Sequence, residues 1–270
     1  MKRREGGEKV RRGRRILLVD NDPVVLEALG DMLEAKDYQV TKARDGLEAL
    51  ERFRESQFDV VIFDLVLPKI DGHDLCRRIR QDERGHLLPL IAITPLAPHD
   101  VVKLPGLSAD AYVAKGPLGV IIPNILEAIK SVLTKRKGRV KPAIYGYEGF
   151  HPRQIVSELF ALKQYYQRVV HSAAEFVVEL DAQGKVLSAS LGALRLLGQS
   201  EAEITGRSIS HLLAPPDRPT LENLMQRMSR DPEQPAAVIT VTLAGKHHRL
   251  RCRPVTDGGT ILGFLITANS

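Results

Sequence analysis

Residues 59–72 read DVVIFDLVLPKIDG, and this stretch decides the fold of the first half of the chain. Four apolar residues, 60–63, precede the acid Asp64, as in a short strand that is buried on both faces of a sheet. Pro68 and Gly72 then break the strand period. A buried strand that ends in a carboxylate and leads into a helix is typical of a parallel α/β sheet.

Four further apolar runs of similar length lie on either side of this strand. They are Ile16–Val19, Gln39–Ala43, Leu90–Ile93 and Tyr112–Ala114. Helical patterns separate the runs; in the first, Leu26, Leu29 and Leu33 share one face, with Asp22 as the expected N-cap and Pro23 at the first helical position. Strands that alternate with helices predict a doubly wound α/β domain with a five-stranded parallel sheet over residues 16–135.

Polar side chains stand at the ends of four of these strands: Asp20, Asp64, Thr94 and Lys115. Because parallel strands present their carboxyl ends at one edge of a sheet, we expect these side chains to lie close together. A carboxylate nucleophile, a metal-binding acid, a hydroxyl and an ammonium group together suit phosphoryl transfer to a carboxylate. A plain structural ion pair between Asp64 and Lys115 is the alternative.

At these residues the sequence resembles the receiver domain of two-component response regulators. The matching stretches are ILLVDNDP (16–23), DVVIFDLVLPKIDG (59–72), LIAIT (90–94) and SADAYVAKGP (108–117). The resemblance implies a flavodoxin-like fold in which Asp64 is the phosphoacceptor. It also implies Mg²⁺ bound by Asp20, Asp64 and the backbone carbonyl of Val66.

The same resemblance assigns the remaining residues of the site. Thr94 is the switch hydroxyl, Lys115 pairs with the phosphoryl group, and Tyr112 is the aromatic residue that reorients. Two positions depart from the family pattern. Asn21 stands where receivers usually have a second acid, which predicts weaker Mg²⁺ binding. Gly116 separates Lys115 from the proline that usually follows it directly through a cis bond.

The charge of the chain is unevenly distributed. The 270 residues include 39 Lys and Arg and 33 Asp and Glu, a net charge of +6, yet residues 16–134 carry −6. The excess lies in residues 1–15 and 135–141, so we expect a solvated basic arm at 1–15, with nucleic-acid association as the alternative and no basic DNA-binding domain. Two cysteines and no long apolar run predict a cytoplasmic protein without membrane spans.

The middle of the chain is predicted to connect two domains. Residues 136–152 are rich in Lys, Arg, Pro and Gly, which indicates a linker. A helix follows over 153–171. Its apolar residues at positions 155, 159, 162, 166 and 169 form a heptad seam, which predicts a homodimer or, alternatively, packing on the next domain.

Residues 172–270 show the period of strands. The candidates are Phe176–Leu180, Val186–Ser190, Ala237–Leu243, His247–Arg253 and Thr260–Thr267. Short helical patterns between the second and third strands predict an α+β domain with a five-stranded antiparallel sheet. The domain resembles a PAS domain in FVVELDAQGKVLSASLGALRLLGQSEAEITGRSI (176–209), LLAPPDR (212–218) and ILGFLITA (261–268). The resemblance leaves its ligand unknown.

These observations predict a signalling protein that is not an enzyme. In the first hypothesis, Asp64 accepts a phosphoryl group from a sensor histidine kinase, and the change is relayed to the PAS domain, whose output is contact with an unknown protein. In the second, the receiver is degenerate and serves as a scaffold. The PAS domain then senses a small ligand or binds a protein without phosphorylation. Asn21 and Gly116 favour the second hypothesis, whereas Asp64, Thr94 and Lys115 favour the first.

Overall fold

The computed structural model describes residues 13–97, 107–134, 142–147 and 154–268, and it divides into two compact units, 1–160 and 161–270. The basic arm therefore lies outside the described residues, apart from its last three. So does the stretch 98–106, where prolines predict a short or broken helix. Each unit is described by itself below.

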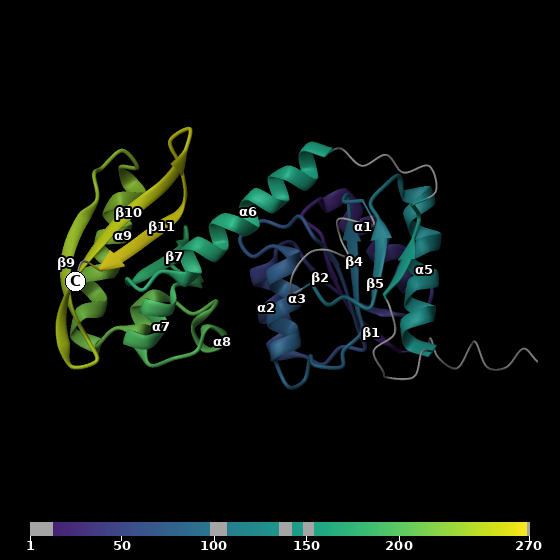
Figure 1. Cartoon of the computed structure of the whole chain (residues 1–270), viewed down its shortest axis with the longest axis horizontal. Helices are drawn as coiled ribbons and strands as arrows, with labels where there is room; N and C mark the ends of the chain where they lie inside the picture. The colour runs from purple at the N-terminus through teal and green to yellow at the C-terminus, as the bar shows by residue number, and fades with distance from the viewer. Residues whose placement is uncertain (1–12, 98–106, 135–141, 148–153, 269–270) are drawn as a thin grey trace, which may run out of the picture. The chain divides into compact units, whose positions relative to one another are not determined.

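The first unit is a parallel sheet covered by helices on both faces (Figure 1). Its elements are β1 (Arg15–Val19), α1 (Pro23–Glu34), β2 (Gln39–Ala43), α2 (Gly46–Glu55), β3 (Val60–Asp64), α3 (Gly72–Gln81), β4 (Leu90–Thr94), β5 (Ala111–Ala114), α5 (Leu118–Thr134) and β6 (Ala143–Tyr145). The strand order is β2-β1-β3-β4-β5-β6, with every neighbouring pair parallel. The doubly wound α/β prediction is confirmed.

Alternating side chains of the central strands build the two halves of the core. Ile16 and Ile62 face one way and pack with Leu29 of α1 and Ile125 of α5. The alternate residues of the same strands, such as Leu17 and Val61, are also buried and belong to the opposite face, which α2 and α3 cover (Figure 1). At α1, the carboxylate of Asp22 accepts hydrogen bonds from the backbone of Val24 and Val25, so the predicted helix cap is confirmed.

The sheet has six strands, one more than predicted. Residues Ala143–Tyr145 fall within the predicted linker 136–152, yet they pair with β5, whose outer edge would otherwise be open. Three residues are too few for a period to be recognised in a sequence, and the surrounding prolines and glycines indicate a loop. The pairing therefore depends on the open edge of β5 in the folded domain and not on the local sequence of residues 143–145.

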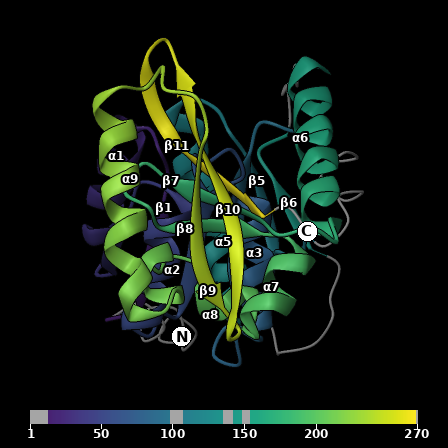
Figure 2. The ribbon, with the colours of Figure 1, turned by 90° about the vertical axis from the view of Figure 1, so that its left-hand side faces the viewer.

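The second unit is an antiparallel sheet with helices on one face (Figure 2). Helix α6 (Gln154–Ser172) precedes it, and then follow β7 (Val177–Asp181), β8 (Val186–Ala189), α7 (Leu191–Leu197), α8 (Glu201–Ile204), the 3₁₀ turns η1 (Ile209–Leu212) and η2 (Pro215–Asp217), α9 (Arg218–Arg230), β9 (Ala237–Leu243), β10 (Lys246–Asp257) and β11 (Thr260–Ala268). The order β8-β7-β11-β10-β9 confirms the predicted five-stranded sheet. Leu224 and Met228 of α9 pack on Leu250 and Phe264 in its core.

Candidate functional site

The four predicted polar residues meet at the carboxyl edge of the parallel sheet. Asp20 directly follows β1, Asp64 and Thr94 end β3 and β4, and Lys115 directly follows β5. The register of the sheet brings these residues to the same level, because Asp64 pairs with Ile93 and the backbone NH of Lys115 donates to the carbonyl of Thr94 at 2.8 Å. Parallel pairing thus brings residues that are far apart in sequence to one end of the sheet, as predicted.

Lys115 joins the two carboxylates. Its ammonium group donates to Oδ2 of Asp64 and lies 3.2 Å from Oδ2 of Asp20. Asp20 and Asp64 are buried, whereas 29% of the Lys115 side chain is exposed. The site is therefore a pair of buried acids that share one cation, and the cation is the group in contact with solvent.

Burial and neighbouring charge have opposite effects on the pKa values of Asp64 and Lys115. Burial raises the pKa of Asp64, and the neighbouring Lys115 only partly offsets this effect. For Lys115, burial lowers the pKa, but the attraction of Asp64 and Asp20 together outweighs it, so that its pKa is raised. Lys115 therefore stays charged at neutral pH and holds the acids in place.

Backbone groups orient the two carboxylates. The NH of Asp22 donates to Oδ1 of Asp20 at 2.9 Å, and the NH of Val66 donates to Oδ1 of Asp64 at 3.1 Å. Asp22 itself is committed to its role as helix cap. The loop therefore bends back so that Val66 lies beside the Asp64 carboxylate. Val66 is also the residue whose backbone carbonyl is predicted to bind the metal ion.

Two departures from the receiver pattern lie beside the acids. Asn21 is exposed and follows the buried Asp20. Among the peptide bonds described, none is cis, so the bond between Lys115 and Gly116 is trans. Within the described part of the chain, no group of three or more His, Cys, Asp and Glu residues could hold a metal ion. A cation at this edge thus has two carboxylates to bind, Asp20 and Asp64.

Thr94 and Tyr112 lie behind the acids on neighbouring strands. Thr94 is fully buried, and its hydroxyl accepts a hydrogen bond from the backbone NH of Leu96 at 3.0 Å. Tyr112 is 3% exposed, and burial raises its pKa to about 12. Since Ala92 pairs with Tyr112 and Thr94 pairs with Ala114, both side chains lie on the same face of the sheet.

Tyr147 is a residue of this region that sequence reasoning missed. It follows β6 within the predicted linker, and its phenol oxygen is buried. Burial raises its pKa, and so does the nearby phenol of Tyr112. The signal in the sequence is the run AIYGY (143–147), in which two aromatic residues interrupt a basic, glycine-rich stretch.

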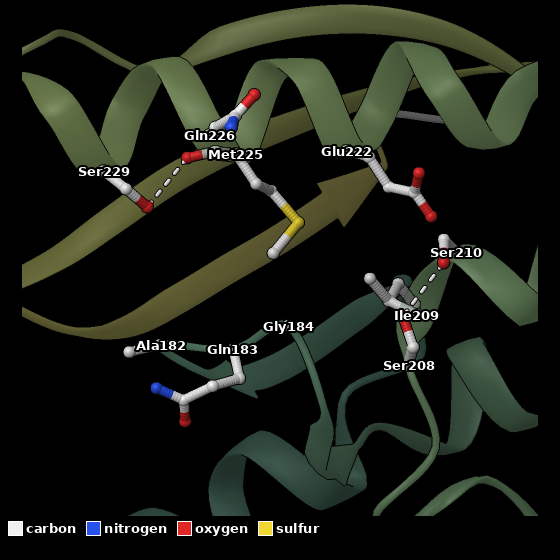
Figure 3. Close-up of a pocket in the computed structure, with 10 residues that line it drawn as sticks. All are labelled: Ala182, Gln183, Gly184, Ser208, Ile209, Ser210, Glu222, Met225, Gln226 and Ser229. Atoms are coloured by element: carbon white, nitrogen blue, oxygen red, sulfur yellow. Dashed lines mark hydrogen bonds between the residues drawn. The ribbon is translucent and has the colours of Figure 1, made fainter.

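The second unit contains a small pocket outside its core (Figure 3). The pocket has a volume of about 210 Å³ and lies between α9, the β7–β8 turn and the start of η1. Met225 lies over Gly184, which has a φ of 78°, and a Cβ at this position would be 2.6 Å from Met225 Cε. The rim is polar, with Glu222 as its one acid and a hydrogen bond between Ser208 and Ser210.

Comparison with known proteins agrees with this geometry. The profile of the response regulator receiver domain matches residues 16–119, and that of the PAS fold matches residues 164–270. The polar-differentiation response regulator DivK of Brucella ovis is 31% identical over 119 residues, which are 44% of this chain and 94% of that protein. Fold and site thus define a two-component receiver. The chain belongs to the response regulator receiver family and carries a PAS domain after its receiver.

Two other relatives match less than half of this chain. A gliding motility regulatory protein of Myxococcus xanthus is 36% identical over 107 residues, but the match spans 39% of this chain and 14% of that protein. The transcriptional regulator RpaA of Synechocystis is 33% identical over 48% of this chain and 52% of its own length. The chain therefore spans 14% of the first of these relatives and about half of the second.

Solved receiver domains also resemble part of this chain. That of a signal transduction histidine kinase from Syntrophus aciditrophicus is 30% identical, with a TM-score of 0.41 over 48% of this chain and 98% of that chain. That of a sensor histidine kinase from Pseudomonas aeruginosa, solved with a magnesium ion in its active-site cleft, is 30% identical with a TM-score of 0.39, covering 44% of this chain and 95% of that chain. Across the described residues, the helices are too short or too polar to cross a membrane.

Proposed function

We propose that the chain is a phosphorylated response regulator in which Asp64 accepts a phosphoryl group from a sensor histidine kinase. A carboxylate oxygen of Asp64 attacks the phosphorus, and an acyl phosphate forms. The N–P bond of the kinase's phosphohistidine breaks, and its electron pair returns to the imidazole nitrogen. The observation that carries the proposal is the shared contact of Lys115 with Asp64 and Asp20, because it places a cation where the incoming charge must be balanced.

Mg²⁺ fits the donors of this edge. It prefers oxygen ligands, usually one or two carboxylates with water and phosphate oxygens, and Asp20 and Asp64 supply two carboxylates. The backbone carbonyl of Val66 is the third protein ligand in this proposal. When bound, the ion neutralises charge on the phosphoryl oxygens. Asn21 contributes no negative charge, so we expect weak binding.

The remaining residues of the site respond to the phosphoryl group. Lys115 moves from the carboxylates to a phosphoryl oxygen and pairs with it as a point charge. The hydroxyl of Thr94 leaves the backbone NH of Leu96 and donates to another phosphoryl oxygen. Because Tyr112 lies on the same face one strand away, the space that Thr94 vacates is available to its ring.

In the same proposal the PAS unit passes the change to a protein partner, and the chain catalyses no reaction on a substrate of its own. Helix α6 leads into this unit and presents Leu162, Tyr166 and Val169, which are 50%, 60% and 48% exposed. An exposed apolar stripe at heptad spacing supports a homodimer through this helix. A cytoplasmic location is supported by Cys76 and Cys252, which are both free.

A second function is favoured by the pocket of the PAS unit. Its volume is below the 300–1,000 Å³ typical of drug-sized ligands, so a small polar molecule fits it better than haem or flavin. Cys252 is an unsuitable thiol for flavin chemistry, since burial raises its pKa to about 11. In this alternative the receiver is a scaffold that is not phosphorylated, and the PAS unit senses the ligand.

Treatment with acetyl phosphate distinguishes the two functions. The full chain is incubated with Mg²⁺ and the donor, and its intact mass is measured beside that of Asp64→Asn, which has no nucleophilic carboxylate. The proposal predicts the addition of one phosphoryl group to the wild type and none to the variant. An unchanged wild-type mass at saturating Mg²⁺, with the Asn21→Asp variant unchanged as well, favours the scaffold.

A further inference from the structure

Arginine side chains form a row on one face of the PAS sheet. Arg249, Arg251 and Arg253 occupy alternate positions of β10, and all three are exposed. The residues between them, Leu250 and Cys252, are buried in the core on the opposite face. Because successive residues of a strand point to opposite faces, the three arginines share one face and lie about 6.8 Å apart along it. We call these three residues the arginine row.

Within the described part of the chain, the arginine row has no carboxylate partner. None of its three guanidinium groups takes part in an ion pair or a side-chain hydrogen bond there. Glu179 of β7 belongs to the same face, since it pairs with Leu265, which in turn pairs with Arg253. It is two strands away from β10, about 9.6 Å across the sheet. Three like charges in a row repel one another, so they attract a partner that brings negative charge.

Apolar side chains lie on both sides of the row. On β9, Val238 pairs with Arg251 and is 44% exposed. On β11, Leu265 pairs with Arg253 and is partly exposed. The face therefore combines positive charge with apolar contact, as surfaces that bind amphipathic protein segments do.

We propose that the arginine row binds an acidic amphipathic helix of a partner protein. Carboxylates at every fourth position of a helix are about 6 Å apart, close to the spacing of the row. Each guanidinium group can donate two parallel hydrogen bonds to one carboxylate, which a lysine cannot do. Apolar residues beside the acids of that helix contact Val238 and Leu265. The inference rests on the proposed function for the role of the PAS unit in output, and it adds the chemistry of the protein partner.

Two other occupants fit this face less well. Single-stranded nucleic acid is typically bound by aromatic side chains on which its bases stack. The residues that pair with the row on β9 and β11 are Val, Thr and Leu, none of which is aromatic. Helix α6 of this chain contains Lys163 and Arg168 against Glu158, so its net charge has the same sign as the row.

Fluorescence anisotropy with the full chain tests the inference. The probe, called the patterned peptide, is a labelled synthetic helix with glutamate at every fourth position and leucine beside these acids. A peptide of the same composition in scrambled order is its control. We expect the patterned peptide to bind at least about fivefold more tightly than the scrambled one, and to bind more weakly as salt rises from about 0.05 to about 0.5 M. Equal binding of the two peptides would refute the inference.

Charge variants locate the binding on the row. Arg251→Glu should weaken binding of the patterned peptide about tenfold or more, because like charges then face each other. Arg230→Glu makes the same change in net charge on α9, which covers the opposite face, and should change the affinity by less than about twofold. Arg251→Lys keeps the charge without the forked donor, so its affinity should lie between those of the wild type and Arg251→Glu. Equal losses in Arg251→Glu and Arg230→Glu would show nonspecific attraction and refute the row as the binding site.

Further measurements identify the other occupants. Tighter binding of oligothymidylate than of the patterned peptide, abolished by Arg251→Glu, would assign the row to nucleic acid. A change of oligomeric state in Arg251→Glu, without peptide binding by the wild type, would assign it to a second copy of the chain. Either result overturns the proposal.

Acetyl phosphate labelling of Asp64 on the same preparations separates this inference from the proposed phosphorylation. Labelled Asp64 without peptide binding refutes the arginine row as a docking surface and leaves the phosphoacceptor in place. Peptide binding without labelling supports the docking surface and refutes the phosphoacceptor.

Discussion

Replacing Lys115 with alanine exposes the electrostatic basis of the site. The substitution leaves the buried carboxylates of Asp20 and Asp64 without their shared counter-charge. At the 3.2 Å between Lys115 Nζ and Asp20 Oδ2, one such attraction amounts to about 5 kcal/mol before desolvation is subtracted, taking a dielectric constant of roughly 20. Breaking a buried ion pair costs about 3–5 kcal/mol, and the 29% exposure of Lys115 places the expected loss near 3 kcal/mol.

Calorimetry of the full chain in EDTA measures this loss. About 3 kcal/mol corresponds to a decrease of roughly 10 °C in the melting temperature of the receiver transition. Lys130→Ala on α5 is the matched control, since this lysine is exposed and should change stability by less than about 0.5 kcal/mol. Mg²⁺ should restore much of the loss, because it supplies the missing positive charge.

A double variant decides whether the loss comes from the unpaired acids. Lys115→Ala with Asp64→Asn removes one buried charge, so it should be more stable than Lys115→Ala alone by at least about 1 kcal/mol. Strictly additive effects of the two substitutions, or a loss below about 1 kcal/mol in Lys115→Ala, would refute the picture of two buried carboxylates that depend on one ammonium group.

Three further variants test other parts of the account. Asn21→Asp should tighten Mg²⁺ binding about tenfold in titration calorimetry, because it adds a charge a few ångströms from a divalent ion; unchanged affinity would place the ion elsewhere. Burial holds the pKa of Tyr112 near 12 against 10 in the unfolded chain, so this residue stabilises the fold below pH 10 and the contribution is lost as the pH rises to 12. The free energy of unfolding in urea should therefore decrease with pH over this interval by up to about 1.4 kcal/mol per pH unit more in the wild type than in Tyr112→Phe. Equal slopes in the two proteins would contradict the burial of Tyr112. The double substitution Ile155→Asp/Leu162→Asp should convert a dimer to a monomer in light scattering, and a monomeric wild type at tens of micromolar would exclude dimerisation through α6.

The residues of the candidate site could be located from sequence because each one ends an apolar run. A strand buried on both faces is a continuous apolar stretch, and the first polar residue after it must lie at the sheet edge. This reasoning placed Asp20, Asp64, Thr94 and Lys115 at one edge, where the structure has them. It could not reveal that Lys115 contacts both carboxylates, since this contact depends on the side-chain conformation of Lys115 and on the register of the strands.

The sixth strand shows where sequence reasoning stops. Ala143–Tyr145 has no recognisable period, and its pairing depends on the open edge of β5, which is remote in sequence. The partial burial of Tyr147, which follows β6, was hidden for the same reason. The seam of α6 is a different case: the helix itself is present, but a heptad pattern specifies an apolar face without specifying what covers it.

Chemical trapping of the acceptor tests the central claim most directly. The full chain is treated with acetyl phosphate and Mg²⁺, reduced with borohydride, which converts an aspartyl phosphate to homoserine, and mapped by tandem mass spectrometry. The account predicts homoserine at position 64 in the wild type and none anywhere in Asp64→Asn. Conversion at Asp20 or another acid, or no conversion at position 64 under conditions that label a known receiver, would contradict it.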